Sequence, residues 1–317
     1  MAKNFSVFQW LYQFATSMKN KKIYNKKIFI WNDNFSMVNT LFEALIDKNQ
    51  LKMLKTNPPV NFPAENLTWL GEFTKLGSNH KEITDNLIQN FSRAFTHIRL
   101  YHACCPMSLQ SYYKKGFIQL DPEDVEKNFK EVFSPHASQE NIRNAIQEGQ
   151  NFIAEMTNLR HLEARKKIHF PIDKNFIDKE CGVFMLGGEY LVFLVNSLTG
   201  IDTFNKQKIL LQGRIPTVFI VDMPIKMIDE NHLSWIARNI ASKWVCIYLK
   251  KEEHNDLHGS ISFSQVEPQY IHEHYHLKKI VTRNLDTELP MTLDLYCDKC
   301  CANKMISIVQ NISGSFI

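Results

Sequence analysis

The chain has 317 residues, of which 44% are hydrophobic and 22% are charged. This composition is ordinary for a globular protein and argues against wholesale disorder, and the length suffices for one large domain or two smaller ones. The net charge of +4, from 37 basic and 33 acidic residues, is too small an excess to indicate nucleic-acid binding by itself.

Three features of the sequence predict a protein of the cytoplasm. The first is that no uninterrupted apolar run is long enough to span a bilayer. The second is that the N-terminus places an aromatic stretch before a basic cluster, which reverses the order of a secretory signal. The third is the set of seven cysteines, an odd number that includes two adjacent pairs. That set is a poor disulfide framework and fits reduced thiols.

Residues 1 to about 95 have the pattern of helices anchored by aromatic and leucine side chains. A turn-rich stretch around Pro58, Pro59 and Pro63 joins these helices, and a short β run that ends at Trp31 interrupts them. We therefore expect a helical N-terminal region.

The pattern changes near residue 96. The run THIRLYHA is β-prone, and SLQSYYKKG after it predicts a helix of one to two turns closed by Gly116. A longer helical stretch begins with Asp121 as N-cap and Pro122 at the first helical position, and continues through QENIRNAIQEGQNFIAEMTNLRHLEARKK. We interpret this longer stretch as a helical insertion.

Further β-like segments follow: KIHFPI near Phe170, GVFML near Phe184, PTVFIVDMPI near Phe219, WVCIYL near Ile247 and SISFSQV near Phe263. Two helices are expected among them, the apolar GEYLVFLVNSLTG and the amphipathic MIDENHLSWIARNIASK. Strands with unequal, often short connections favour a compact mixed sheet over a doubly wound parallel one. The expected fold is α/β of the α+β type, with a helical region at 1–95, an α/β domain at 96–285 and a C-terminal extension at 286–317.

Signatures of several common enzyme classes are missing from the sequence. There is no GxxxxGK[ST] loop, no GxGxxG turn after a strand and no GxSxG elbow, and the letters HEHYH at 272–276, which match HExxH, stand in a run interpreted as a strand and not as a helix. The chain is therefore not an obvious P-loop enzyme, Rossmann dehydrogenase, α/β-hydrolase or zincin.

The segment IRLYHACCPMSLQSYYKKGF resembles the opening of the ADP-ribosyltransferase superfamily. In that family a first strand ending in Tyr-His-small-Thr/Ser is followed by a short helix and a glycine-led loop. The resemblance implies that NAD is bound by four residues: Tyr101, His102, Ala103 and Gly116. The histidine would hydrogen-bond the nicotinamide ribose, and the adjoining backbone would bind the nicotinamide amide. Cys104 stands where the family has Thr or Ser, so one expected hydroxyl contact is missing.

Downstream, the order of segments is similar to that family to about residue 280, and the resemblance leaves the other site residues open. Candidates for the catalytic glutamate are Glu267, Glu189 and Glu273, and candidates for the aromatic that stacks on nicotinamide are Tyr190, Phe184 and Phe170. We take Glu267 and Glu189, together with His102, as catalytic candidates. Tyr190 is taken as a cofactor-binding residue.

The chemistry of NAD cleavage requires a carboxylate and residues that bind the ribose and the nicotinamide. The glycosidic bond breaks through an oxocarbenium-like transition state, so the reaction needs a carboxylate near the ribose hydroxyls and a tightly held nicotinamide. Each candidate also has a structural alternative. His102 can be a satisfied strand histidine, Glu189 a first-turn acid that interacts with a helix dipole, and Glu267 an exposed turn residue.

The run IHEHYH places His272, His274 and His276 at period-two spacing, which puts all three on one face if the segment is a strand. Three imidazoles on one face suit Zn²⁺ or another divalent ion. No Asp or Glu at ligand spacing completes the set, however. We therefore expect a polar or solvated strand face and less than stoichiometric metal.

The C-terminal region contains Cys297-x-x-Cys300, with Cys301 beside it. A single CxxC is half of a zinc site, and the chain has no second one. Metal binding together with the histidine run is one interpretation, and ordinary reduced thiols are the one we favour.

Basic and aromatic residues alternate in the stretch MKNKKIYNKKIFIW, which contains Lys19, Lys21, Lys22, Tyr24, Lys26 and Lys27. Such interleaving suits a phosphate backbone and base stacking. A solvated helix end followed by a core strand explains the same residues, and we favour that interpretation.

The sequence leads to one main hypothesis and two alternatives. The main hypothesis is an NAD-dependent ADP-ribosyltransferase whose macromolecular acceptor is a nucleic acid or a protein, with RNA or DNA slightly favoured. The resemblance suggests a bacterial toxin or antiviral-defence effector, with an antitoxin or regulatory protein as partner. One alternative is a non-enzymatic nucleic-acid or protein interaction module in which His102 is structural. The other is a metal-dependent enzyme built on the strand of His272, His274 and His276.

Overall fold

The computed structural model describes residues 26–31, 33, 35–43, 45–74, 76–77, 79–119, 121–159, 167–180, 187–212, 214–251, 259–276, 279–282, 285–290 and 297. The helices are α2 (Phe35–Glu43), α3 (Lys48–Thr56), α4 (Thr68–Gly71), α5 (His80–Ala94), α6 (Gln110–Lys115), α7 (Pro122–Phe133), α8 (Gln139–Leu159), α9 (Lys174–Glu180), α11 (Glu189–Ser197), α12 (Thr203–Leu211), η2 (Ile225–Met227), α13 (Glu230–Tyr248) and η3 (Pro268–Tyr270). The strands are β1 (Ile28–Phe29), β2 (His97–Cys104), β3 (Phe117–Ile118), β4 (Ile168–Pro171), β5 (Thr217–Pro224), β6 (Ser260–Phe263), β7 (Gln265–Val266), β8 (Ile271–His276), β9 (Lys279–Thr282) and β10 (Leu285–Pro290).

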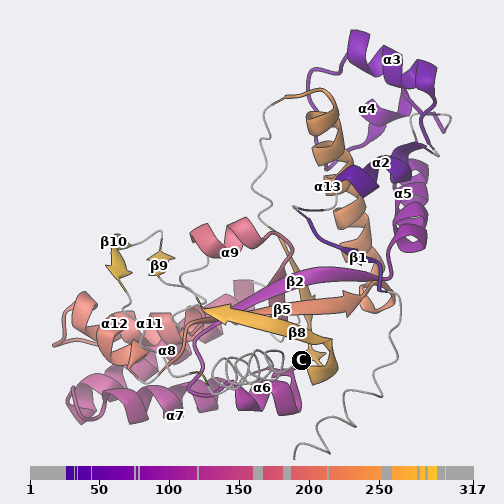
Figure 1. The fold of residues 1–317 in the computed structure, drawn as a ribbon. Helices are drawn as coiled ribbons and strands as arrows, with labels where there is room; N and C mark the ends of the chain where they lie inside the picture. The colour runs from indigo at the N-terminus through magenta and orange to yellow at the C-terminus, as the bar shows by residue number, and fades with distance from the viewer. Residues whose placement is uncertain are drawn as a thin grey trace, which may run out of the picture.

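A four-stranded sheet in the order β1-β2-β5-β8 lies between the helical parts of the chain (Figure 1). β1 runs parallel to β2, whereas β2, β5 and β8 are antiparallel neighbours. Small sheets pair β3 with β7, β4 with β6, and β9 with β10. The fold is therefore mixed α/β, as the sequence predicted.

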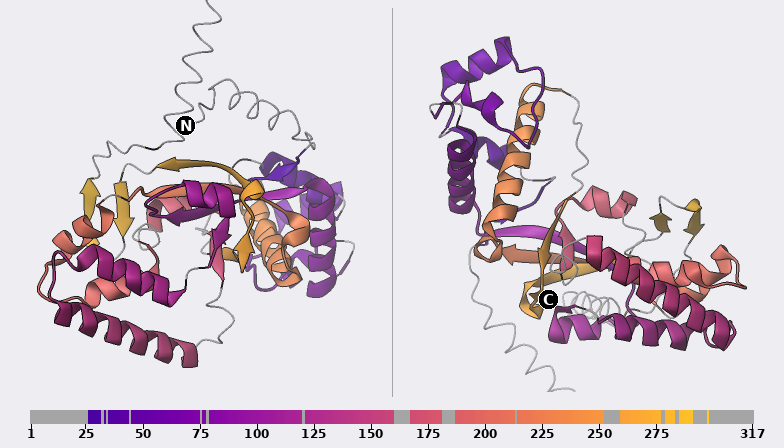
Figure 2. Two further views of the ribbon diagram at one scale, coloured as in Figure 1. Left: turned by 90° about the horizontal axis from the view of Figure 1, so that it is seen from below. Right: turned by 180° about the vertical axis from the view of Figure 1, so that it is seen from behind.

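The two faces of the sheet bury different cores, because successive side chains of a strand point to opposite sides. On one face Ile98 and Leu100 of β2 join a cluster that continues into the N-terminal helices and α13. On the other face Tyr101 and Ala103 pack in a second cluster, to which α7, α8, α11 and α12 contribute. Figures 1 and 2 show this second group of helices gathered away from α13. The stretch that the sequence suggested to be an insertion thus supplies the layer that covers one face of the sheet.

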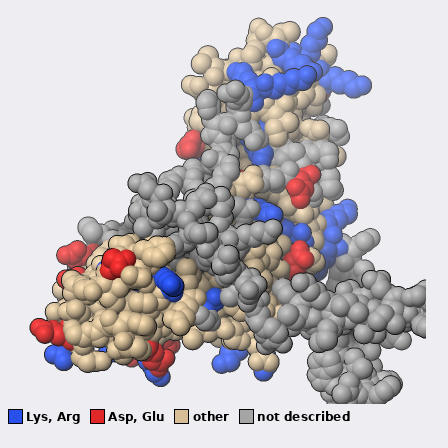
Figure 3. All heavy atoms as spheres, turned by 60° about the vertical axis from the view of Figure 1, so that its left-hand side comes forward, with Lys and Arg blue, Asp and Glu red and all other residues tan. Residues whose placement is uncertain are grey.

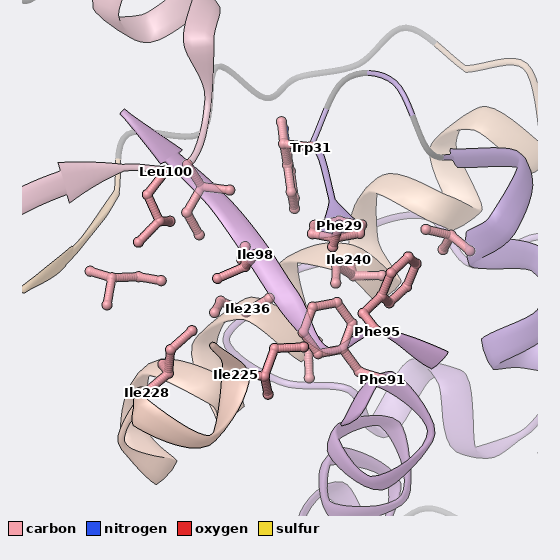
Figure 4. Packing of buried hydrophobic residues seen from close by; sticks show 14 of the residues in the cluster. Phe29, Trp31, Phe91, Phe95, Ile98, Leu100, Ile225, Ile228, Ile236 and Ile240 are labelled. Atoms are coloured by element: carbon pink, nitrogen blue, oxygen red, sulfur yellow. The ribbon is translucent and has the colours of Figure 1, made fainter. Parts of the chain in front are cut away.

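The N-terminal helices share their core with the sheet. Figure 4 shows Phe29, Phe91 and Phe95 packed together beside Ile98 of β2 and Ile240 of α13. β1, which precedes these helices in the chain, is itself a strand of the central sheet. The core therefore crosses the boundary that the sequence suggested between residues 95 and 96.

The strand expected near Ile247 is wrong, because these residues form the last turns of α13. Ile236, Ile240 and Trp244 recur every fourth residue and are all buried. The Trp244 ring stacks on Phe42 of α2, with ring centroids 4.1 Å apart. The helical period of burial therefore continues to the end of the segment and overrides the β preference of its valine, isoleucine and aromatic side chains.

Candidate functional site

A row of side chains crosses three strands on the face of the sheet that carries His102. The register places His102 of β2 opposite Phe219 of β5, and Phe219 opposite His274 of β8. Tyr112 and Tyr113 of α6 pack on Phe219, with ring centroids at 4.8 and 5.9 Å. The row therefore has a histidine at each end and an aromatic cluster between them.

His102 lies against aromatic rings from two other strands. Its ring centroid is 4.8 Å from Phe117 of β3 and 5.1 Å from Phe170 of β4, and its Nδ1 lies 3.1 Å from the carbonyl oxygen of His169. A carbonyl only accepts hydrogen bonds, so we assign the proton to Nδ1. Burial lowers the pKa of His102 to about 4. The ring is therefore neutral near pH 7, and its Nε2 is an acceptor for a hydroxyl group.

Gly116 allows the turn before β3 to pack directly on the end of β7. Its φ is +78°, and a Cβ there would lie 2.0 Å from the carbonyl oxygen of Val266 and 3.0 Å from Cα of Glu267. No residue with a side chain fits this contact without moving the backbone. The sequence singled out Gly116 and Glu267 separately, and the structure brings them side by side next to Phe117, whose ring contacts His102.

The second glutamate candidate, Glu189, lies in the first turn of α11, directly after Gly188, which has φ +90°. Burial lowers the pKa of His169, and the charge of Glu189 opposes that shift. His169 Nδ1 in turn lies 3.2 Å from Ser260 Oγ, and its carbonyl holds His102. Glu189 therefore acts electrostatically on His169, whose carbonyl positions His102. The third candidate, Glu273, is an exposed residue of β8.

The other residues predicted from β2 lie on the face opposite His102. The side chains of Tyr101 and Ala103 lie in the second core, on the face opposite His102, and burial raises the pKa of Tyr101 to about 12. β1 pairs only with His97 and Ile98. Among the strands that the structure describes, the rest of β2 is therefore paired along the β5 edge alone. The backbone at Ala103 remains a candidate for binding an amide, but the Tyr101 phenol is directed away from His102.

Tyr190 does not join this group. Its hydroxyl donates to Glu126 Oε1 at 2.7 Å, and its ring lies over Gly149, so it is held in the layer of α7, α8 and α11. The position of Tyr190 on α11 directs it toward these helices, whereas Phe170 lies fully buried against His102. Phe184, the third aromatic candidate, lies outside the described residues.

The prediction that three histidines share one face of β8 is wrong. The pairing of β5 with β8 shifts register between Ile220 and Val221, which leaves a bulge at His272. His272 Nδ1 lies 3.6 Å from Asp222 Oδ2 instead of beside the other two histidines. His274 and His276 remain neighbours, with ring centroids 5.1 Å apart, and buried Cys297 lies against them. Cys300 and Cys301 lie outside the described residues.

Sequence reasoning missed an ion pair that is buried beside the sheet. Arg99 and Asp222 are directly paired residues of β2 and β5. Arg99 Nε and Nη2 lie 2.8 and 3.1 Å from the two carboxylate oxygens, and the Asp222 side chain is 1% exposed. No local motif links two residues so far apart in the chain, so only the strand pairing reveals the interaction.

Residues 18–25 of the basic stretch that the sequence singled out lie outside the described residues, which begin at Lys26. Figure 3 shows Lys and Arg side chains at the end of the molecule that carries α3. That helix contributes the exposed residues Lys48, Lys52 and Lys55.

No helix within the described part of the chain combines the length and apolar character needed to cross a membrane.

Stability should depend on pH through His102. The pKa of this histidine is about 4 in the folded chain and 6.5 in the ordinary reference state. As pH falls between these values, the unfolded chain takes up a proton that the folded chain does not, so the free energy of unfolding should decrease by up to about 3 kcal/mol. Above this window the contribution is constant.

Urea unfolding across this pH range would check the expectation. His102→Asn is the comparison, because an asparagine amide does not titrate and can still donate to the His169 carbonyl. In His102→Asn, the decrease in the free energy of unfolding that comes from protonation of His102 should be absent. The same decline in both proteins would show that His102 titrates normally.

Comparison of the chain with protein-family models, curated proteins and solved structures finds no match.

Proposed function

We propose that the chain is an NAD-dependent ADP-ribosyltransferase whose nicotinamide-ribose site is built around His102. The observation that supports this best is that the backbone of Glu267, from a distant segment, packs on Gly116 next to Phe117, whose ring contacts His102. His102, Gly116 and Glu267 are the histidine, the loop glycine and a late carboxylate that the family resemblance singled out.

Each part of the site suits one part of NAD. The Nε2 atom of neutral His102 accepts a hydrogen bond from a hydroxyl of the nicotinamide ribose. The β2 backbone at Ala103 pairs with the nicotinamide amide, as an added strand would pair with a sheet edge. Phe170 is fully buried with its ring centroid 5.1 Å from His102, so it fixes the orientation of the imidazole.

Glu267 is the carboxylate that we assign to the reaction. The bond between nicotinamide and ribose C1′ breaks, its electron pair leaves with nicotinamide, and C1′ is attacked by a nucleophile of the acceptor, which loses a proton. Positive charge builds on the ribose in the transition state, and a carboxylate at the 2′-hydroxyl stabilises it. Glu267 lies in an exposed turn, where Gln269 donates a hydrogen bond to its carboxylate. Glu189 has a sufficient structural role as a first-turn acid of α11.

The acceptor is a macromolecule, and we favour RNA or DNA over protein. Lys26 and Lys27 belong to the N-terminal basic stretch, and the lysines of α3 form a further basic surface (Figure 3). Lysines on a surface suit a phosphate backbone, which dominates nucleic-acid affinity. An activity of this kind fits a toxin or defence effector of the cytoplasm that is held in check by an antitoxin or regulatory protein.

The strongest competing function is a binding module in which His102 is purely structural. The hydrogen bond from Nδ1 to the His169 carbonyl and the surrounding rings of Phe117 and Phe170 are what a satisfied strand histidine needs. Such a protein would bind nucleic acid or protein without cleaving NAD. The two proposals differ in whether NAD binds at all.

Calorimetric titration of NAD into the purified chain separates these two functions. We expect saturable binding to the wild type and a loss of at least tenfold in affinity for His102→Ala. Tyr190→Phe is the matched control, because the Tyr190 hydroxyl is engaged with Glu126 in the other helical layer. Absence of NAD binding to the wild type, or equal binding by His102→Ala, would favour the binding module.

A further inference from the structure

Three potential metal ligands converge where β8 meets the C-terminal part of the chain. One ligand atom each from His274, His276 and Cys297 lies within 4.8 Å of the others. Cys297 is 3% exposed, and its Sγ is 3.4 Å from His274 Nε2. The two histidines alternate along the strand and so share a face, since the bulge at His272 lies before them.

In both His274 and His276, the Nδ1 atom lies within hydrogen-bonding distance of a protein oxygen atom. Nδ1 of His274 lies 2.7 Å from the Tyr113 hydroxyl. Nδ1 of His276 lies 3.3 Å from the Pro216 carbonyl oxygen and 3.2 Å from Thr217 Oγ1. The Pro216 carbonyl only accepts, so Nδ1 of His276 carries the proton and Nε2 the lone pair. Partners on the remote ring nitrogen are how proteins orient histidines that bind a metal through the other nitrogen.

The distance between the Cys297 sulfur and the His274 nitrogen matches a zinc site. Zn–N bonds of about 2.0 Å and Zn–S bonds of about 2.3 Å in a tetrahedron put nitrogen and sulfur roughly 3.5 Å apart. The observed distance between Cys297 Sγ and His274 Nε2 is 3.4 Å. A hydrogen bond between thiol and imidazole would explain that distance, but it would not explain why His276 joins the same cluster.

We infer that His274, His276 and Cys297 bind a Zn²⁺ ion that ties the chain at residue 297 to β8. Two imidazoles and a thiolate are ligands that suit zinc over magnesium or calcium. Because Tyr113 belongs to α6, the ion also braces the helix that leads to Gly116. The site is distinct from the NAD site that we propose, since Phe219 lies between His274 and His102 in the row across the sheet.

Elemental analysis of the full-length chain, purified without a polyhistidine tag or chelators, tests this inference. We expect about one equivalent of zinc per chain, and we expect chelation to lower the melting temperature and added Zn²⁺ to restore it. His274→Ala and Cys297→Ser should each lower zinc affinity at least 100-fold. His272→Ala and Cys246→Ser are matched controls that should keep zinc, because His272 lies by Asp222 and Cys246 lies in α13.

Cobalt substitution keeps the test decisive if a variant fails to fold. Co²⁺ bound to the wild type should give the visible bands of a tetrahedral site and a thiolate-to-cobalt charge-transfer band in the near ultraviolet. Three results would overturn the inference: a wild type that retains no zinc after saturation and desalting, a cobalt complex without the thiolate band, or equal zinc loss in His272→Ala and His274→Ala. None of these readouts depends on NAD, so a negative result would refute the zinc site without refuting the proposed enzyme function.

Discussion

Replacing Glu267 by glutamine is expected to lower the rate of ADP-ribosyl transfer at least 100-fold while NAD affinity changes by less than about threefold. Glutamine keeps the size and shape of the side chain and one oxygen that can accept a hydrogen bond, but it removes the negative charge. That charge matters most when the ribose becomes cationic, so the cost should appear in turnover and not in binding. The measurement is single-turnover transfer of labelled ADP-ribose to a cell lysate, beside calorimetric NAD binding.

Two matched variants make this test specific. Glu189→Gln alters the acid at the start of α11, and Glu273→Gln alters an exposed acid on β8. Both should transfer within about threefold of the wild type, because a first-turn acid or a surface acid contributes little to chemistry. A large loss in Glu189→Gln with none in Glu267→Gln would move the catalytic role to α11 and refute our assignment.

Replacing Asp222 by alanine should lower the free energy of unfolding by about 3 to 5 kcal/mol. The Arg99 side chain is 16% exposed and makes two hydrogen bonds to this carboxylate. The variant therefore leaves a largely buried guanidinium without its counter-charge, and burying an unpaired charge is far more costly than losing a surface ion pair. Urea unfolding at neutral pH measures the difference.

The partners of Asp222 provide the controls for this prediction. His272→Ala should cost less than about 1 kcal/mol, because that side chain is 47% exposed and lies 3.6 Å from the carboxylate. The double variant Arg99→Met with Asp222→Leu should recover most of the stability, since it leaves no buried charge behind. A double variant as unstable as Asp222→Ala would show that the loss comes from packing and not from the unpaired charge.

Local signals predicted much of the fold. Asp121 caps α7 through a hydrogen bond to the backbone N–H of Glu123, with Pro122 at the first helical position, as the sequence indicated. β2 spans the expected run, and Gly116 closes α6 with a positive φ. Each of these depends on residues within a few positions of one another, which is the range over which capping and turn chemistry act.

What the sequence could not predict depends on contacts between distant segments. The bulge at His272 results from how β8 pairs with β5, and it separates this histidine from the other two. Tyr190 has an aromatic side chain of the right kind, but the packing of α11 on α7 and α8 engages it with Glu126. His102 and Gly116 came from one continuous motif, whereas the approach of Glu267 became visible only through the contact of Gly116 with the end of β7.

The proposed function is tested most directly by asking whether the wild-type chain breaks the bond between nicotinamide and ribose. The chain should be incubated with NAD labelled separately in the nicotinamide and in the adenylate, together with a lysate as the source of acceptor. We predict that free nicotinamide is released and that the adenylate label appears on precipitated macromolecules. Nuclease treatment should release this adenylate label, whereas protease treatment should not. Intact NAD after prolonged incubation with a chain shown to be folded would contradict the proposed function.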